Sequence, residues 1–224
     1  MKKQEILKWH KRRQQHWRAV PECGQYIPYC GKQFIVYPGV FWPFEDSVPL
    51  IENLKIKLGD TVLDVGTGSG VIATYAACKG AGRIVAIDIN PLAVKAAQTN
   101  AKEHGFGTVI DTRVSDLFCA LGQEKYDVIT ANLPWLDHPA SDLVESAQWD
   151  NGFKTNKEFF SRVAQYLKPR GRIYFAQGNY GAINKVRALA SENRFQMRLL
   201  DQKPYSRDNR LLFYVFEITR LDLS

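Results

Sequence analysis

Cysteine and clustered histidine are scarce in this chain, and long apolar runs are missing. The four cysteines, at positions 23, 30, 78 and 119, form no Cys-x-x-Cys pair and have no histidine cluster beside them. This spacing favours neither a zinc site nor a disulfide framework, so a reducing cytosol is the expected compartment. No apolar run approaches the roughly 18 residues of a membrane span, and the N-terminal residues are charged, without a signal-type apolar core. We expect a soluble, cytoplasmic protein.

Basic residues are in excess, but the excess is local. Lys and Arg outnumber Asp and Glu by 30 to 23, which gives a formal net charge of +7. Residues 1–20 contain seven basic residues and one acid, so they carry most of this charge. They also place a thin apolar stripe on one side of a helix, formed by Ile6, His10, Arg13, Trp17 and Val20. We therefore expect a basic N-terminal arm over residues 1–33 and a single domain over residues 34–224.

From residue 61 onward, short apolar runs alternate with helical segments. The runs that predict buried strands are TVLDV, RIVAID, TVIDTRV, YDVITA and RIYFAQ. Strands that alternate with helices imply a parallel sheet covered on both faces. The last two β-rich stretches, FQMRLL and LLFYVFEI, have no helix between them and should add an antiparallel edge. The prediction is an α/β, doubly wound, Rossmann-like sheet of seven strands, mostly parallel, with an antiparallel C-terminal edge strand.

The first of these strands, TVLDV, contains Asp64, and the turn that follows it contains Gly66, Gly68 and Gly70. Glycines let the backbone turn sharply and approach a ligand closely, which suits an anionic or ribose-bearing group; a turn without a ligand is the alternative. Asp88 ends the next strand, where a carboxylate can accept hydrogen bonds from ribose hydroxyls. The dinucleotide fingerprint needs a small residue at position 71, and Val71 stands there. A ligand without a pyrophosphate is therefore favoured.

The segments VLDVGTGSG, AIDINP, VSDLF and YDVITANLPW resemble, in order and spacing, the motifs of class I S-adenosylmethionine-dependent methyltransferases. The resemblance covers residues 35–218. Within that superfamily the chain is most similar to the HemK-type group, also called the small-methyltransferase domain. FWPFEDSVPLIENL resembles the group's segment before the first strand. DNGFKTNKEFFSRVAQYLKPRG resembles the group's segment that follows the tetrapeptide NLPW, residues 132–135 here.

The resemblance implies S-adenosylmethionine as the cofactor and gives its residues their roles. The methionine part of the cofactor is wrapped by Asp64, Gly66, Gly68 and Gly70. Asp88 holds the ribose, Asp116 meets the adenine amino group, and Asn132 lies beside the reacting methyl. A plain loop carboxylate is the alternative for Asp116. Trp42 and Glu45 are expected on the substrate side. Glu45, Asp46 and Ser47 match the place where HemK-type enzymes carry an acidic residue followed by Thr or Glu, near cofactor and substrate, and a helix N-cap is the alternative for these three residues.

Asn132, Pro134 and Trp135 form the candidate catalytic cluster at the tip of YDVITA. A planar amide or amino nitrogen is a poor nucleophile because its lone pair is delocalised. Two acceptors aimed at its hydrogens, the Asn132 side-chain oxygen and the carbonyl of Leu133 or Pro134, would free that lone pair. Trp135 offers a flat face for stacking, and in-line positioning would supply most of the rate effect. This scheme requires neither a general base nor a metal.

The resemblance implies a class of acceptor and leaves its identity open. HemK-type enzymes methylate a glutamine amide in peptide-chain release factors, and close relatives methylate adenine or guanine amino groups in RNA. Leu133 stands where the family usually has the first proline of Asn-Pro-Pro-aromatic. The form found here, Asn-Leu-Pro-aromatic, resembles that of ribosomal RNA adenine dimethylases. We expect an N-methyltransferase that acts on a protein glutamine. An RNA amino group or a small-molecule amine stays open, and a cofactor-binding protein without activity is the last alternative.

The basic arm has two interpretations. It can be a docking helix for RNA or a ribosomal complex, in which each neutralised phosphate adds salt-sensitive affinity. Alternatively, Trp9 and Trp17 pack it on the domain and its charges face water, as charged helix faces usually do.

Overall fold

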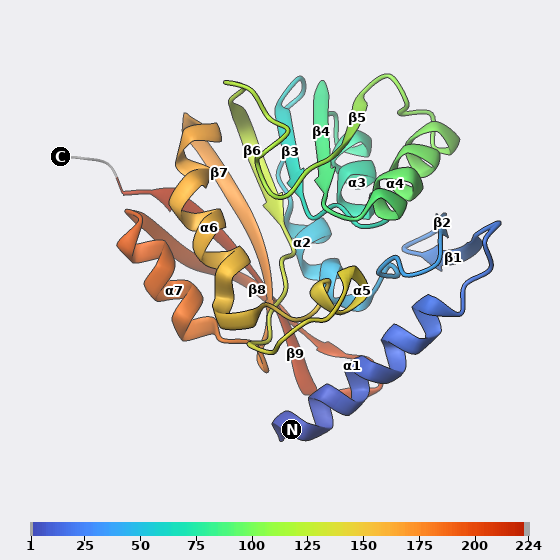
Figure 1. Cartoon of the computed structure of the whole chain (residues 1–224). Coiled ribbons are helices and arrows are strands. Elements are labelled where there is room, and N and C mark those ends of the chain that lie inside the picture. Colours follow the sequence, from blue (N-terminus) through green and yellow to red (C-terminus); the bar gives the residue numbers. More distant parts are fainter. Residues whose placement is uncertain (1, 222–224) are drawn as a thin grey trace.

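The computed structural model describes residues 2–221, which form an α/β fold around a seven-stranded sheet (Figure 1). The strands lie in the order β5-β4-β3-β6-β7-β9-β8, and the pairs from β5 to β7 are parallel. This confirms the predicted fold class. The strands are β3 (Thr61–Val65), β4 (Arg83–Asp88), β5 (Ile110–Val114), β6 (Tyr126–Ala131), β7 (Leu167–Gly178), β8 (Phe195–Tyr205) and β9 (Asp208–Arg220).

The C-terminal strand β9 is antiparallel, as predicted, and lies one place inside the edge of the sheet. It pairs antiparallel with both β7 and β8, so β8 forms the edge. A tight turn joins β8 to β9, and without a crossover helix the chain must reverse its direction between them.

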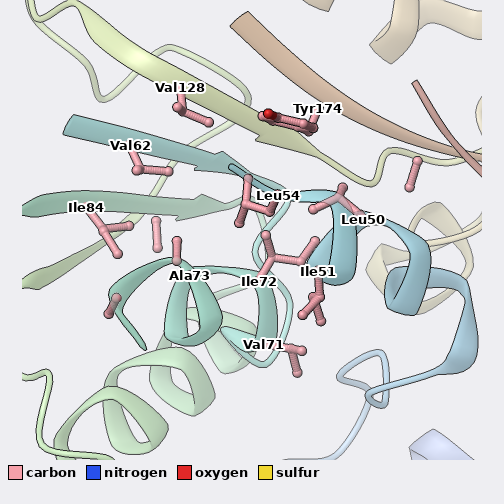
Figure 2. Packing of buried hydrophobic residues seen from close by; sticks show 14 of the residues in the cluster. Leu50, Ile51, Leu54, Val62, Val71, Ile72, Ala73, Ile84, Val128 and Tyr174 are labelled. Carbon is pink, nitrogen blue, oxygen red and sulfur yellow. The ribbon is translucent and has the colours of Figure 1, made fainter. Parts of the chain in front are cut away.

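Helices cover both faces of the sheet (Figure 1). The apolar side chains of successive strand residues point to opposite faces, so Val62 and Leu63 belong to different core clusters. Figure 2 shows the first cluster, in which Leu50, Ile51 and Ile72 pack against the sheet. The helices on that face are α2 (Val48–Asn53), α3 (Val71–Cys78) and α4 (Pro91–Glu103), and those on the other are α6 (Lys154–Arg162) and α7 (Ile183–Glu192).

The N-terminal residues form a helix and a small hairpin that pack on this core. The elements are α1 (Lys3–Arg18), β1 (Gln25–Tyr29) and β2 (Lys32–Val36). Helix α1 buries one face, as the sequence predicted, and the buried residues are Ile6, His10, Gln14 and Trp17. Their spacing of three and four residues places them on one side of a helix. The charged side chains of Lys8, Lys11 and Arg12 are exposed.

Short elements connect these parts. They are α5 (Leu143–Ser146) and the 3-10 turns Glu45–Ser47, Asn151–Phe153 and Val163–Tyr166. Within residues 2–221, no helix combines the length and apolar character that crossing a bilayer requires. All four cysteines are exposed free thiols.

Candidate functional site

A cavity lies at the carboxyl ends of β3, β4 and β6, the edge of a parallel sheet at which ligands usually bind. The structure brings most of the predicted site residues to its wall, namely Trp42, Gly66, Gly68, Asp88, Asp116, Asn132, Pro134 and Trp135. Three others lie outside the wall, namely Glu45, Asp64 and Gly70. Two residues of helix α1 that the sequence analysis did not propose for the site, His10 and Arg13, complete the wall.

The glycine-rich turn after β3 has two kinds of glycine. Gly66, Gly68 and Gly70 all have positive φ angles, which favour glycine. A Cβ added to Gly68 would meet nothing within 4 Å, so this part of the turn faces open space in the cavity. A Cβ added to Gly70 would lie 2.9 Å from the Cα of Ala97. Gly70 therefore allows α3 and α4 to pack closely and does not border the cavity.

Asp64 lies beneath this turn. Its side chain is buried, and its carboxylate accepts hydrogen bonds from Thr67 Oγ1 at 2.6 Å and Thr130 Oγ1 at 2.7 Å. Burial raises the pKa of Asp64 to about 6, although the two hydroxyl donors oppose this shift. The placement gives Asp64 the role of a brace for the turn, because the wall of the cavity does not include it.

Asp88 lies at the end of β4 and borders the cavity. Its two carboxylate oxygens accept hydrogen bonds from the backbone N–H groups of Gly68 and Asn90, both at 2.9 Å. Burial raises the pKa of Asp88, and these backbone donors oppose the shift. Each carboxylate oxygen can accept a second hydrogen bond, so the group can serve the turn and a ligand together.

Asn132 borders the cavity just after β6, and its neighbours fix the orientation of its amide. Nδ2 donates to Asp46 Oδ2 at 3.3 Å and to Ser47 Oγ at 3.2 Å. A carboxylate only accepts, so the NH₂ group must face Asp46. Oδ1 is therefore the atom of this amide that is left for a ligand.

The next residues of the tetrapeptide are also held in place. The Pro134 carbonyl accepts a hydrogen bond from Asn156 Nδ2 at 2.9 Å, and Asn156 is fully buried. Within the described residues, the Leu133 carbonyl accepts no hydrogen bond and is the freer of the two backbone acceptors that the sequence suggested. Asn156 had no role in the sequence analysis, because a polar residue in the first turn of a helix has many possible reasons to be there.

Trp135 belongs to both the core and the cavity. Only 5% of its surface is exposed, and its ring packs 5.4 Å from Tyr180 and 6.0 Å from Phe213. A Cβ on Gly178 would overlap the indole, so glycine is required beneath it. Trp135 is nevertheless one of the residues that line the cavity.

Asp46 is the site residue that the sequence did not single out from its neighbours. It is 5% exposed, and burial raises its pKa to about 6, while the Arg13 charge and the hydrogen bonds from Asn132 and Ser47 oppose this shift. Ser47 occupies the N-cap position of α2, but neither its side chain nor that of Asp46 makes a capping hydrogen bond, so the two side chains are left for Asn132. Glu45 does not line the cavity, and its carboxylate accepts hydrogen bonds from Ser206 N and Oγ at 2.8 and 2.5 Å.

Helix α1 supplies the outer wall of the cavity on the Asp46 side. Trp149 Nε1 donates to His10 Nδ1 at 3.0 Å, which places the proton of a neutral imidazole on Nε2. Burial and the Arg13 charge lower the pKa of His10 to about 3, so the ring stays neutral at physiological pH. The Arg13 guanidinium lies 3.7 Å from the centre of the Phe44 ring.

Metal ligands do not gather at this site. Across the described residues, no three His, Cys, Asp or Glu side chains are grouped as a metal ion would require.

Comparisons with known proteins point to methyltransferases. A family model described as "Ribosomal protein L11 methyltransferase (PrmA)" matches residues 46–149. A Methanocaldococcus jannaschii protein with the provisional name protein N5-glutamine methyltransferase is 35% identical over 180 residues, which are 75% of this chain and 89% of the relative. The release factor glutamine methyltransferase of Geobacter sulfurreducens is 34% identical over 133 residues, 56% of this chain and 45% of the relative. The chain thus spans most of the archaeal relative and less than half of the bacterial one.

Solved structures agree on the fold. The ribosomal protein L11 methylase of Lactobacillus delbrueckii subsp. bulgaricus has a TM-score of 0.62 at 25% identity, and the match covers 91% of this chain and 94% of that one. A 16S rRNA N2 methyltransferase of T. thermophilus, in complex with AdoMet and guanosine, has a TM-score of 0.63 at 19% identity, covering 88% of this chain and 50% of that one. At this lower identity the likeness concerns the fold alone.

Proposed function

The chain belongs to the class I S-adenosylmethionine-dependent methyltransferases of the HemK type, and from this premise we propose that it methylates the side-chain amide nitrogen of a protein glutamine. The archaeal relative, which matches over most of both chains, is named for this reaction. Other relatives are named for the same reaction on release factors. A release factor is therefore the acceptor that we expect.

The residues on the Asp88 side of the cavity fit S-adenosylmethionine. Gly68 leaves space for a ligand to approach the backbone, and Asp88 keeps lone pairs for the ribose hydroxyls. Within residues 2–221, no hydrogen bond uses the Asp116 carboxylate, which leaves it available to the adenine amino group. We assign cofactor contacts to these residues and to Gly66. When bound, the cofactor supplies an electrophilic methyl group on a sulfonium sulfur.

The observation that carries the proposal is the fixed orientation of Asn132. Asp46 and Ser47 hold its NH₂ group, so Oδ1 can accept a hydrogen bond from the acceptor amide. The Leu133 carbonyl can accept the second amide hydrogen. Together the two acceptors draw the hydrogens from the amide plane and free the nitrogen lone pair. The Trp135 face can stack on the amide, and positioning of this kind accounts for large rate effects.

This scheme needs no side chain to remove a proton before methyl transfer. An amide nitrogen that has gained a methyl group is cationic and loses its proton readily to water. The chain's contribution is to bind, orient and desolvate the acceptor.

Tritium transfer from labelled S-adenosylmethionine tests the proposal. We expect label in a release factor, and mass spectrometry should locate the methyl group on a glutamine side chain. Incubation with total RNA and with a mixture of small amines provides the comparison. Label in RNA or in an amine, with none in protein, would refute the proposed acceptor, and cofactor binding without any transfer would refute catalysis.

RNA is the second candidate acceptor, and the exposed face of α1 is the observation that favours it. Lys8, Lys11 and Arg12 project to solvent from a helix that carries most of the net charge. If this face binds phosphates, changing all three residues to Gln should weaken RNA association and lower the slope of log affinity against log salt by about 0.7 for each lost phosphate contact. An unchanged slope would remove this candidate role.

A further inference from the structure

Helix α1 brings a cation into the acceptor side of the cavity. The helix runs past α5 and the start of β9, at the edge of the sheet where the cavity lies (Figure 1). Most of its basic residues face water, but Arg13 borders the cavity beside Asp46. The sequence pattern alone made Arg13 part of the packing stripe and assigned it no contact with a ligand.

The Arg13 guanidinium is fixed by aromatic rings. It lies over Phe44 at 3.7 Å from the ring centre and within about 5 Å of the ring centres of Trp9, Trp17 and Phe41. Cation–π contacts of this kind hold the plane of the group but leave its N–H donors unused. The position of the guanidinium is thus set before any acceptor arrives.

The N–H donors of Arg13 are free to bind an acceptor. Within residues 2–221, no hydrogen bond or ion pair uses these donors. A nitrogen without a partner that was also fully buried would be an unsatisfied buried atom, and no Arg13 nitrogen is one. Its donors therefore reach solvent-accessible space. His10 lies on the same wall with a buried Nε2 that has no partner and, by the tautomer above, carries a hydrogen. Because that Nε2 is buried, Arg13 supplies the accessible donors of this part of the wall.

The charge balance indicates which acceptor atom these donors suit. Asp46 is a buried carboxylate beside Arg13, so the wall is close to neutral when both are ionised. A phosphate would have to be buried against that carboxylate, which is unfavourable. A neutral carbonyl oxygen gains a charge-assisted hydrogen bond from Arg13 without this repulsion.

We propose that Arg13 binds a main-chain carbonyl oxygen of the acceptor protein, next to the glutamine that is methylated. This inference rests on the proposed function. The oxygen of the target amide itself is unsuitable, because a cation there would draw the nitrogen lone pair into the amide and suppress its attack. Helix α1 is then the element that selects a polypeptide acceptor, and Arg13 is a specificity-determining residue.

Steady-state kinetics on the full chain test this inference, with a release factor as the acceptor. Arg13→Gln should raise the KM for the release factor by roughly 10- to 100-fold, the range of a lost charged hydrogen bond, with kcat changed by only a few-fold. The two enzymes are compared at their own pH optima, because loss of the Arg13 charge raises the pKa of Asp46. Arg13→Lys should fall between Arg13→Gln and the wild type, because it keeps the charge without the planar fork. Arg170→Gln, which removes an exposed charge near the start of β7, at the opposite end of this strand from the cavity, is the matched control and should leave KM unchanged.

Two further measurements separate recognition from structure. The Kd for S-adenosylmethionine should match the wild type within error. The Tm of Arg13→Gln should fall, because the contacts with four aromatic rings are lost, but the variant should stay folded at the assay temperature. An unchanged KM in Arg13→Gln, or an equal weakening of cofactor binding, would overturn the role of Arg13 while leaving glutamine methylation intact. Transfer by the wild type to RNA and never to protein would instead overturn the proposed function.

Discussion

At the scale of single residues, the site depends on which end of the Asn132 amide faces the acceptor. An amide can present either an oxygen or an NH₂ group, and only the oxygen can accept a hydrogen from the target nitrogen. The Asp46 carboxylate accepts a hydrogen bond from Asn132 Nδ2, so the NH₂ group faces Asp46 and the oxygen is left for the acceptor. In the proposed reaction, Asn132 supplies the acceptor atom and Asp46 is the positioning residue that orients it.

Replacement of Asn132 by Ala should lower kcat by about 10²-fold or more, because the target nitrogen loses one of its two positioning acceptors. The Kd for S-adenosylmethionine should stay nearly the same, since the cofactor contacts lie mainly at the Asp88 side. Single-turnover methyl transfer and calorimetry measure the two effects. An equal loss of turnover and cofactor affinity would contradict the separation of roles.

The activity should also depend on the ionisation of Asp46. Burial raises the pKa of Asp46 to about 6, so the carboxylate is protonated below this pH and loses an acceptor that holds Asn132. We expect kcat to fall as the pH decreases through about 6. In Asp46→Asn the rate should be low at every pH and this step should vanish. A step of unchanged size in Asp46→Asn would assign it to another group, such as Asp64.

At the scale of elements, the two kinds of glycine in the turn after β3 separate folding from binding. Gly70→Ala combines a left-handed φ with overlap against Ala97 and should destabilise the fold by roughly 2–5 kcal/mol. Gly68→Ala meets no neighbouring atom and should cost only about 1–2 kcal/mol, but its methyl group enters the cavity and should weaken cofactor binding by roughly tenfold. Urea denaturation and calorimetry measure the pair, and the reverse order of stabilities would contradict this assignment.

The regular elements of the fold could be predicted from sequence because their signals are local. TVLDV, RIVAID and YDVITA are the observed strands β3, β4 and β6, and the Asn90 cap with Pro91 marks the start of α4. The hairpin strand β1 was missed, because Pro28 and the surrounding tyrosines in QYIPY give no alternating apolar pattern. Helix α5 is only four residues long, which is too short for a periodic signal.

The site was predictable where it follows a strand and was not where it depends on distant contacts. Gly66 and Asn132 come directly after strands and Asp88 ends one, so their common edge of the sheet follows from topology. Asp46 and Arg13 reach the same cavity from segments whose local pattern has a simpler explanation, a helix cap for one and a packing stripe for the other. The hydrogen bond of Asp46 with Asn132 and the place of Arg13 on the cavity wall are set by tertiary packing, which a local sequence pattern does not encode.

At the scale of the whole molecule, the cofactor should act as a stabilising ligand. At a concentration of 100 times its Kd, a ligand that binds only the folded state contributes about 2.7 kcal/mol. For a domain of this size, this corresponds to a rise in Tm of roughly 5–10 °C. Asp88→Ala should abolish most of this shift and Asn132→Ala should preserve it, as measured by scanning calorimetry. A similar shift in both variants would contradict the assignment of Asp88 to the cofactor.

The position of α1 also has a consequence for how the protein is made. Ile6 packs in one cluster with Leu211, which belongs to β9, although the two residues lie far apart along the chain. During synthesis on the ribosome, the apolar face of α1 therefore stays uncovered until β9 has emerged. Because α1 forms a wall of the acceptor site, nascent chains that still lack β9 have no complete pocket, and competence for methylation should arrive only at the end of folding.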